Sequence, residues 1–385
     1  MIASSRSLAA AIGLVLSCAI PAFLAAGLAP QIRGDFGFSD AAVGVVVAIF
    51  FTVSALASRA AGRIVDRIGA VASVRVTALF NVTATLAIAA FASSPATLAA
   101  FLAIAGLANA LATPAVNALL RRDVPSHRLG AAFGVQTAGA SLSGLLAGLA
   151  VPLVALPFGW QWAFVCTAAL ALAAAAMAGA PKPATPGRAP APARPQRADR
   201  AVVTLAIATG LASGAAIALV SFAVLYATHL GIDAGAAGLV LAGLGGGAAL
   251  GRIVTGFLAD RTEDPLSPVL VTLIGGTAGF VLVAAGGTGP LIVGAALAGT
   301  LGWGWHGAMT LAVVRRGSHA PAASVGLMMV GNFAGAVAGP LAAGALADRD
   351  AFTALWIGCA VCMAAAAVLV AATRRHASVI NQTTG

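Results

Sequence analysis

The sequence predicts an all-α integral membrane protein whose twelve transmembrane helices form two pseudo-symmetric six-helix bundles. Its residues are 60% hydrophobic and 8% charged, whereas about a quarter of the residues of a soluble protein are charged. Nine long stretches contain no Asp, Glu, Lys or Arg, and three of them are long enough for two spans of about 20 residues each. Motifs that recur 194 residues apart indicate that the second half of the chain repeats the first.

The double-length stretches each contain a point where a helix is expected to break. These points are Ser93-Ser94-Pro95, the segment from Pro157 to Trp160, and the segment from Gly286 to Pro290. Counting each double stretch as two helices gives twelve. The predicted domains are a six-helix bundle of residues 1–180, a cytoplasmic linker rich in Pro, Ala and Arg at residues 181–200, and a second six-helix bundle of residues 201–385.

The distribution of basic residues predicts the orientation in the membrane. With the N-terminus inside, the cytoplasmic segments hold 19 of the 21 Lys and Arg residues, and the outer loops hold only Arg33 and Arg349. We therefore expect a multi-pass protein of the inner (plasma) membrane with both termini in the cytoplasm. This arrangement explains the net charge of +10, because basic residues of membrane proteins gather in the cytoplasmic loops. The sequence therefore predicts the lipid bilayer as a partner and predicts no nucleic-acid partner.

The recurring motif is a glycine followed, four residues later, by an acid and an arginine. It reads Gly62-Arg63-Ile64-Val65-Asp66-Arg67-Ile68-Gly69 in the first half and Gly256-Phe257-Leu258-Ala259-Asp260-Arg261 in the second. We expect the glycine to allow a tight turn, and the charged pair to lie where the membrane meets water. The motif therefore predicts a loop between two membrane helices in each half.

This motif resembles the loop signature that follows the second helix in the major facilitator superfamily. The family signature reads Gly, three residues, Asp, a basic residue, any residue, Gly and then basic residues. Gly62, Asp66, Arg67 and Gly69 match it, whereas the two residues after Gly69 are not basic. Helix number, spacing and the half-repeat extend the resemblance over almost the entire chain, which implies the transporter fold of that family.

The resemblance implies that the charged pair in each half holds a cytoplasmic gate shut while the transporter is open to the outside. An acid near a helix N-terminus gains about 0.3–1 kcal/mol, and a charge pair shielded from water adds to this. The alternative is an ordinary tight loop with solvated charges. The gate candidates are Gly62, Asp66, Arg67, Gly69, Gly256, Asp260 and Arg261.

The resemblance also implies that helices one, four, seven and ten line a central cavity. On helix four, Asn109, Thr113 and Asn117 recur every four residues and share a face, which suits either solute contact or hydrogen bonding between helices. His306 on helix ten is the one ionisable side chain expected near the middle of a span; it suits a solute ligand or a proton relay, with a packed neutral histidine as the alternative. The other cavity candidates, each with a packing alternative, are Gln136, Phe222, Tyr226, Trp303 and Asn332.

Glycines recur four residues apart on helices five, eight and eleven, which the resemblance assigns to the contact between the halves. Small residues at this spacing let helix backbones approach closely in lipid. Plain packing is the more economical interpretation of any one seam, and the three seams together suggest a contribution to the interface between the moving halves. They consist of Gly144 and Gly148, of Gly243, Gly247 and Gly251, and of Gly331, Gly335 and Gly339.

The absence of certain residue types and motifs from the predicted spans also bears on function. No carboxylate lies inside a predicted span, which disfavours coupling through a buried acid and disfavours a cavity for cations. No enzyme motif and no phosphate-binding glycine-rich loop is present, so we predict neither an enzyme nor ATP-driven transport, and neither a cofactor nor a metal site.

The predicted function is a secondary active transporter that moves a small neutral or anionic solute by alternating access. The solute's own gradient or a coupled proton or other ion would supply the energy, and the functional unit would be a monomer. Two alternatives stand beside this prediction. One is a drug or metabolite efflux pump of the same fold, and the other is a membrane sensor that binds solute without moving it.

Overall fold

The computed structural model describes residues 2–37, 39–125, 129–180, 199–316 and 321–383 of the 385-residue chain. All elements of this described part are helices, as the sequence predicts. Eleven of them are long and apolar enough to cross a bilayer, and the shorter α12 and α13 together make a twelfth passage. Most of the predicted linker, residues 181–198, lies outside the described residues.

The N-terminal half contains six membrane passages, of which α6, η2 and α7 together form the fifth. The breaks predicted from the sequence are confirmed here: Ser94 caps α5 through a reciprocal capping box with Thr97, and Gly159 separates α7 from α8 with a φ of 99°. A short helix that the sequence did not predict, α2, follows α1. The elements are α1 Ile2–Gly27, α2 Ala29–Phe36, α3 Asp40–Ile68, α4 Ala70–Phe91, α5 Pro95–Asp123, α6 Leu129–Ala150, the π-helix η2 Val151–Ala155, α7 Leu156–Phe158 and α8 Trp160–Met177.

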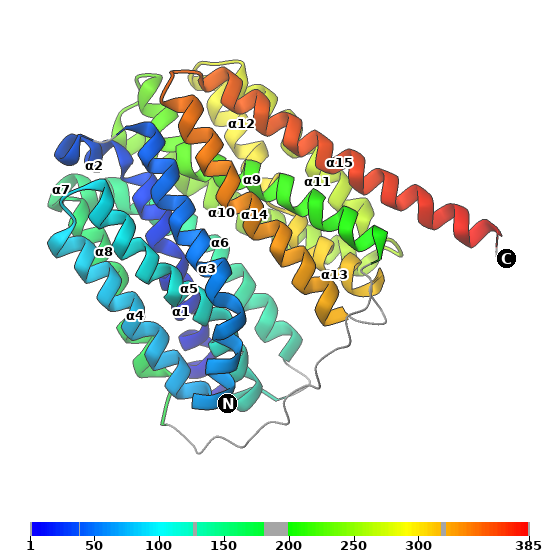
Figure 1. Cartoon of the computed structure of the whole chain (residues 1–385), viewed down its shortest axis with the longest axis horizontal. Helices are drawn as coiled ribbons and strands as arrows, with labels where there is room; N and C mark the ends of the chain where they lie inside the picture. The colour runs from blue at the N-terminus through cyan, green and yellow to red at the C-terminus, as the bar shows by residue number, and fades with distance from the viewer. Residues whose placement is uncertain (1, 38, 126–128, 181–198, 317–320, 384–385) are drawn as a thin grey trace.

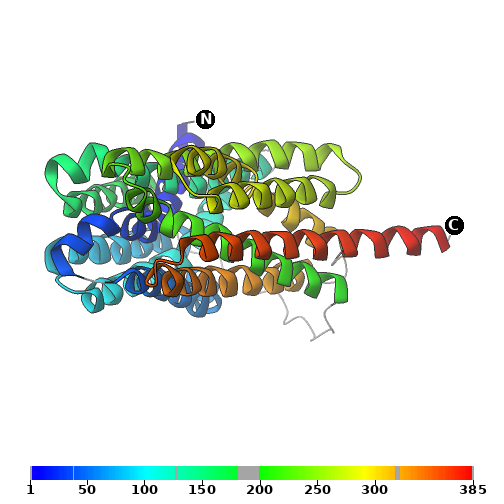
Figure 2. The ribbon, with the colours of Figure 1, turned by 90° about the horizontal axis from the view of Figure 1, so that it is seen from above.

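The C-terminal half repeats this arrangement. Asp199 and Asp233 cap α9 and α10, because each carboxylate accepts a hydrogen bond from a backbone N–H of the first turn. The predicted break near Gly286 is confirmed, since α11 ends at Ala284 and α12 begins at Thr288. The last helix projects past its neighbours (Figures 1 and 2). The elements are α9 Arg200–His229, α10 Ala234–Arg261, α11 Leu266–Ala284, α12 Thr288–Thr300, α13 Trp305–Arg316, α14 Pro321–Ala347 and α15 Phe352–Thr383.

The two halves touch most closely at one end of the bundle. We call the end where α8 finishes and α9 begins the linker end, and the other the opposite end. At the opposite end, a Cβ atom added to Gly44 of α3 would lie 2.2 Å from the carbonyl oxygen of Pro340 in α14. One added to Gly148 of α6 would lie 2.2 Å from the backbone nitrogen of Ala242 in α10. Backbone therefore meets backbone between the halves at this end.

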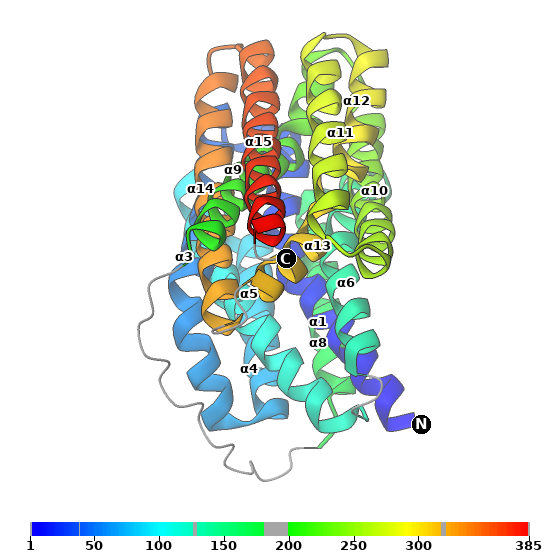
Figure 3. The ribbon, with the colours of Figure 1, turned by 90° about the vertical axis from the view of Figure 1, so that its right-hand side faces the viewer.

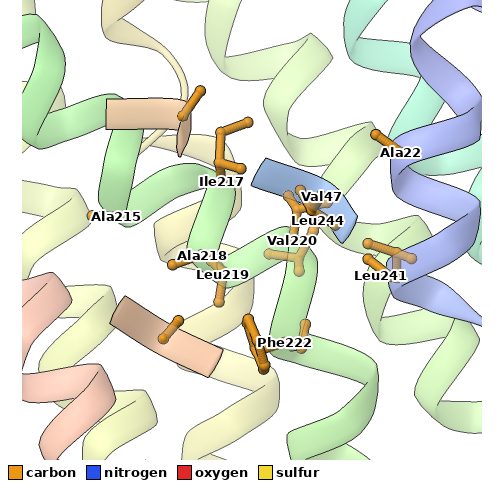
Figure 4. Close-up of a cluster of buried hydrophobic side chains, with 14 of the residues drawn as sticks. Ala22, Val47, Ala215, Ile217, Ala218, Leu219, Val220, Phe222, Leu241 and Leu244 are labelled. Atoms are coloured by element: carbon orange, nitrogen blue, oxygen red, sulfur yellow. The ribbon is translucent and has the colours of Figure 1, made fainter. Parts of the chain in front are cut away.

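Burial along α9 shows where the bundle is closed. Residues 212–227 of α9, towards the opposite end, are buried on every side, whereas Val203 and Ile207, nearer the linker end, are exposed in a groove that α14 and α15 of the same half also line. Side chains of α1, α3 and α10, including Ala22, Val47 and Leu244, join the α9 residues in one buried apolar cluster (Figure 4). The helices of the two halves diverge towards the linker end (Figures 1 and 3). The halves are therefore packed together at the opposite end, and their helices lie further apart at the linker end.

The glycine seams differ from the sequence-based interpretation. Gly331, Gly335 and Gly339 of α14 pack on the α9 backbone at Ala206, Gly210 and Gly214, within the same half. Gly247 and Gly251 pack on Thr300, again within one half, and Gly243 meets nothing. Only the seam of Gly144 and Gly148 meets the other half, at Gly238, Ala242 and Gly245. The interpretation of all three seams as parts of the interface between halves was therefore wrong for two of them.

Candidate functional site

The tenth membrane passage is interrupted near its middle. Residues 301–304 separate α12 from α13, where the sequence suggested one continuous helix. The indole Nε1 of Trp305 donates to the carbonyl oxygen of Gly302 at 2.8 Å and so satisfies part of the freed backbone. Broken helices of this kind form solute sites in many transporters because they expose backbone groups and side chains towards the centre.

The break brings Trp303 and His306 to a partly open site. Both side chains are partly buried, and a side chain at the neighbouring Gly307 would meet nothing within 4 Å. The ring of His306 lies 5.2 Å from that of Trp305, centroid to centroid. Trp303 and His306, two of the predicted cavity candidates, thus lie at the break in the tenth passage, and the residue after His306 has open space beside it.

Arg252 of α10 joins this pair, and the sequence analysis did not single it out. Its guanidinium carbon lies 5.2 Å from the centroid of the Trp303 ring, which is the geometry of a cation–π interaction. It also interacts electrostatically with His306. Arg252 lies well inside α10, which continues to Arg261. A second ionisable side chain therefore lies within a membrane-spanning helix, besides His306, which is the one expected near the middle of a span.

The polar stripe of α5 divides between two environments. Asn109 donates from Nδ2 to the hydroxyl of Ser54 in α3 at 3.1 Å, and that hydroxyl in turn donates to the carbonyl oxygen of Gly106 at 3.0 Å. Asn109 thus joins two helices of one half. Thr113 is exposed and Asn117 is partly exposed on the same face. The hydrogen-bonding alternative holds for Asn109, and Thr113 and Asn117 stay candidates for solute contact.

The aromatic pair of α9 lies in packed surroundings. Phe222 is fully buried in the main apolar cluster, and Tyr226 is 3% exposed. The tyrosine hydroxyl donates to the carbonyl oxygen of Val283 in α11 at 3.4 Å, and its ring packs against Phe352 and Trp356 of α15. This placement favours the packing alternative for both residues over contact with solute.

The two amides on helices five and eleven are less informative. Asn332 lies partly buried in α14, and its backbone carbonyl accepts a hydrogen bond from the Ser213 hydroxyl of α9 at 3.0 Å. Gln136 belongs to α6, but its side chain lies outside the described residues. Their comparable positions in the two halves stay a prediction.

The gate residues lie at the linker ends of α3 and α10. Gly62 and Gly256 are inside these helices, so the expectation that they form the turn was wrong; Gly69, with a φ of 80°, makes the turn from α3 into α4. The acids and arginines of both motifs, Asp66, Arg67, Asp260 and Arg261, are exposed. Arg261 lies over the ring of Phe257, its own neighbour by one helical turn, with its guanidinium carbon 3.7 Å from the ring centroid.

A different acid organises the linker end of the C-terminal half. Asp264, in the connection after α10, accepts from Arg374 of α15 at 2.7 Å and lies 3.9 Å from Arg316 of α13. In the N-terminal half, Ser7 of α1 donates to Asp123 of α5 at 2.5 Å. These contacts join helices of the same half. Each half is therefore stabilised internally at the linker end, where the two halves are apart.

Comparison with known proteins gives a family and a fold. The model of the Major Facilitator Superfamily matches residues 10–326 and 205–383. A crystal structure of a bacterial homologue of the human lysosomal transporter Spinster, in an inward-facing and occupied conformation, is 17% identical with a TM-score of 0.75 and covers 98% of this chain and 96% of that chain. The same homologue in an inward-facing and unoccupied conformation is also 17% identical, with a TM-score of 0.74 and coverages of 96% and 95%.

A mutant of the nucleoside transporter NupG is 14% identical with a TM-score of 0.76, covering 97% of this chain and 99% of that chain. Comparison with curated protein sequences gives no match. At these identities the structural likeness shows the fold, and it confirms the predicted fold class of two six-helix bundles.

Proposed function

The chain belongs to the Major Facilitator Superfamily, and on that premise we propose that it is a secondary active transporter that moves a small neutral or anionic solute by alternating access. One observation carries this proposal. The two halves meet backbone to backbone at the opposite end and diverge at the linker end, and the tenth passage is broken near its middle between α12 and α13. Such a shape becomes a transporter when the two halves rock about the central site.

We further propose that the linker end faces the cytoplasm of a cell whose inner (plasma) membrane holds the protein. Basic residues gather at the linker ends of the helices, as the positive-inside rule requires of cytoplasmic segments. The conformation described above is then inward-facing, the state named for both Spinster-homologue structures. The residues concerned are Arg59, Arg63, Arg67, Arg75, Arg121, Arg122, Arg315, Arg316, Arg374 and Arg375.

The exposed motif residues fit a gate that is open in this state. Asp66, Arg67, Asp260 and Arg261 lie at the linker end, where the halves are apart, and would meet the facing helices when the halves close there. Gly62, Gly69 and Gly256 would shape the backbone beside them. Closure would shield these charges from water and strengthen their interactions.

The energy source follows from the distribution of acids. All eleven carboxylates of the sequence lie at helix ends or in connections. A buried acid as proton carrier is therefore not part of the proposal, and the solute gradient, or an ion that binds elsewhere, drives transport. One chain contains both halves and the site between them, so the proposed functional unit is a monomer.

Flux through purified protein in proteoliposomes tests the proposal. Solutes chosen by thermal stabilisation of the protein are expected to cross the membrane, and unlabelled solute on the far side is expected to accelerate the entry of labelled solute, because a single site alternates between the two faces. A pH gradient separates proton-coupled from uncoupled flux, and the direction of uphill movement identifies an efflux pump. Binding without flux in either direction would support the sensor and reject the transporter.

A further inference from the structure

The pair formed by Arg252 and Trp303 contains hydrogen-bond donors without acceptors. Arg252 lies within a helix that spans the membrane, where a charged side chain is costly unless it has a partner or a function. Its Nε atom and the indole Nε1 of Trp303 are both buried, and neither has a hydrogen-bond partner among the described residues. Both atoms are donors. Buried donors without acceptors are rare in native proteins, so this pair indicates a missing acceptor.

The guanidinium also lacks a counter-charge. The ion pairs of the described part of the chain involve the acids Asp40, Asp123 and Asp264, all at helix ends or in connections, and Arg252 is in none of them. The other ionisable group beside it, His306, lies near enough to interact with it and is not an acid. The site therefore has positive potential, which favours an anion and disfavours a cation.

The position of Arg252 on α10 places it at the boundary between the halves. Gly238, Gly245 and Arg252 follow one another at seven-residue intervals and so lie on one face of the helix. A Cβ atom at Gly238 would lie 2.6 Å from the Cβ of Val151, and one at Gly245 would lie 2.0 Å from the backbone nitrogen of Leu145, so this face points at the fifth passage of the other half. Arg252 continues the face by about 10 Å towards the linker end, where the halves separate.

The neighbouring polar groups suit one small ligand rather than a packed interface. The guanidinium carbon of Arg252 lies 5.2 Å from the centroid of the Trp303 ring, and its Nε has no acceptor, so the guanidinium can still donate to a ligand. Carboxylates match the guanidinium fork because their two oxygens accept two parallel N–H bonds. A Cβ atom at Gly307, the residue after His306, would meet nothing within 4 Å.

We propose that Arg252 binds the carboxylate of a small organic anion, which is the transported solute, and that the indole N–H of Trp303 donates a further hydrogen bond to it. This inference rests on the proposed transport function and narrows its neutral-or-anionic solute to the anionic class. Arg252 contacts the solute directly, and Trp303 both orients the guanidinium and donates to the solute.

The first test compares the stability of the empty protein and needs no knowledge of the solute. Arg252→Gln removes a buried charge that has no acid beside it, so the melting temperature of the ligand-free variant is expected to rise or stay unchanged. Arg374→Gln is the matched control, because it removes an arginine that is paired with Asp264, and its melting temperature is expected to fall. A clear fall for Arg252→Gln would mean that the arginine stabilises the fold and would overturn the proposal.

The second test uses a defined panel of probes. The sodium salts of acetate, lactate, phenylacetate and benzoate are compared with the matching neutral amides, by thermal stabilisation and by uptake into proteoliposomes. At least one carboxylate is expected to stabilise the wild type while its amide does not. Arg252→Gln should weaken this effect by at least about tenfold, Arg252→Lys should weaken it less, and Arg374→Gln should keep it.

The outcomes separate the two proposals. If no carboxylate of the panel stabilises the wild type, or if Arg252→Gln responds as the wild type does, the anion site is wrong. Uptake of a neutral solute at the same rate in wild type and Arg252→Gln would also overturn the anion site and would leave transport standing. A carboxylate that binds through Arg252 and is not taken up would support the anion site and reject transport.

Discussion

The polar residues of α5 have different neighbours although they share one helix face. The side chain of Asn109 donates a hydrogen bond to Ser54 and so links α5 to α3, whereas Thr113, one turn further along α5, is exposed. Hydrogen bonds between membrane helices contribute about 0.6 kcal/mol on average. A stripe of polar residues therefore contains both structural and solute-facing positions, and single substitutions separate them.

We expect Asn109→Ala to lower the free energy of unfolding by about 0.6 kcal/mol without changing the affinity for solute, because it removes one contact between helices of the same half. Thr113→Val is the matched variant. It should leave the stability unchanged and weaken the binding of whichever probe stabilises the wild type. Unfolding in detergent and thermal-shift titrations measure the two effects. A loss of affinity in Asn109→Ala with full stability would assign Asn109 to the solute site instead.

Among the elements, α10 carries contacts to both halves on different faces. Gly247 and Gly251 face Thr300 at the end of α12, and Gly245 faces α6 across the boundary between the halves. The tight approach at Gly251, where an added Cβ atom would lie 1.8 Å from the Thr300 carbonyl oxygen, brings α10 against the break in the tenth passage. This packing brings Arg252 close to Trp303.

Gly245→Ala should destabilise the contact between α6 and α10 by about 1–3 kcal/mol, since its new methyl group would lie 2.0 Å from the backbone nitrogen of Leu145 and neither backbone can yield easily. Gly243→Ala, two residues away on the same helix, meets nothing within 4 Å and should stabilise the helix by about 0.5–1 kcal/mol. Thermal unfolding of the two variants side by side checks this. Equal melting temperatures would contradict the close approach of the helices.

The helices were largely predictable from the sequence, and the contacts between them were not. Charge-free stretches and breaks such as Ser94-Pro95 identify the spans because bilayer thickness fixes their length. The partner of a glycine seam depends on the rotation of each helix, which spacing alone does not encode, so the α14 seam was assigned to the wrong neighbour. Arg252 was missed because a charge was assumed to end a span; the only available signal was the short stretch of residues 234–251 before it.

At the scale of the whole molecule, the two ends of the bundle behave differently. Glycines let α3 meet α14 and α6 meet α10 at the opposite end, and the exposed motif charges lie at the linker end, where the halves diverge. Alternating access requires that these roles exchange, so that the glycine contacts open when the charged ends meet. The close approach of Gly344 to Ala41 gives a direct way to detect this exchange.

The gate residues should set the balance between the two states. Asp66→Asn and Asp260→Asn are expected to weaken closure at the linker end. The ratio of the state closed at the opposite end to the state closed at the linker end should therefore rise by about two- to fivefold. The rate of cross-linking between cysteines at positions 41 and 344 reports this ratio. Arg63→Gln, which removes an exposed charge one turn away, is the control and should leave the rate unchanged. An unchanged rate in both Asp variants would return the motif to an ordinary solvated helix end.

The most direct measurement is flux through a protein whose opposite end is locked by a disulfide. A Cβ atom at Gly344 of α14 would lie 3.1 Å from the Cα of Ala41 in α3, which is close enough for Ala41→Cys and Gly344→Cys to form a disulfide once the four native cysteines are replaced. If the halves alternate, oxidation abolishes flux, reduction restores it, and each single cysteine variant transports under both conditions. Flux that continues at the same rate through the fully cross-linked protein would contradict alternating access.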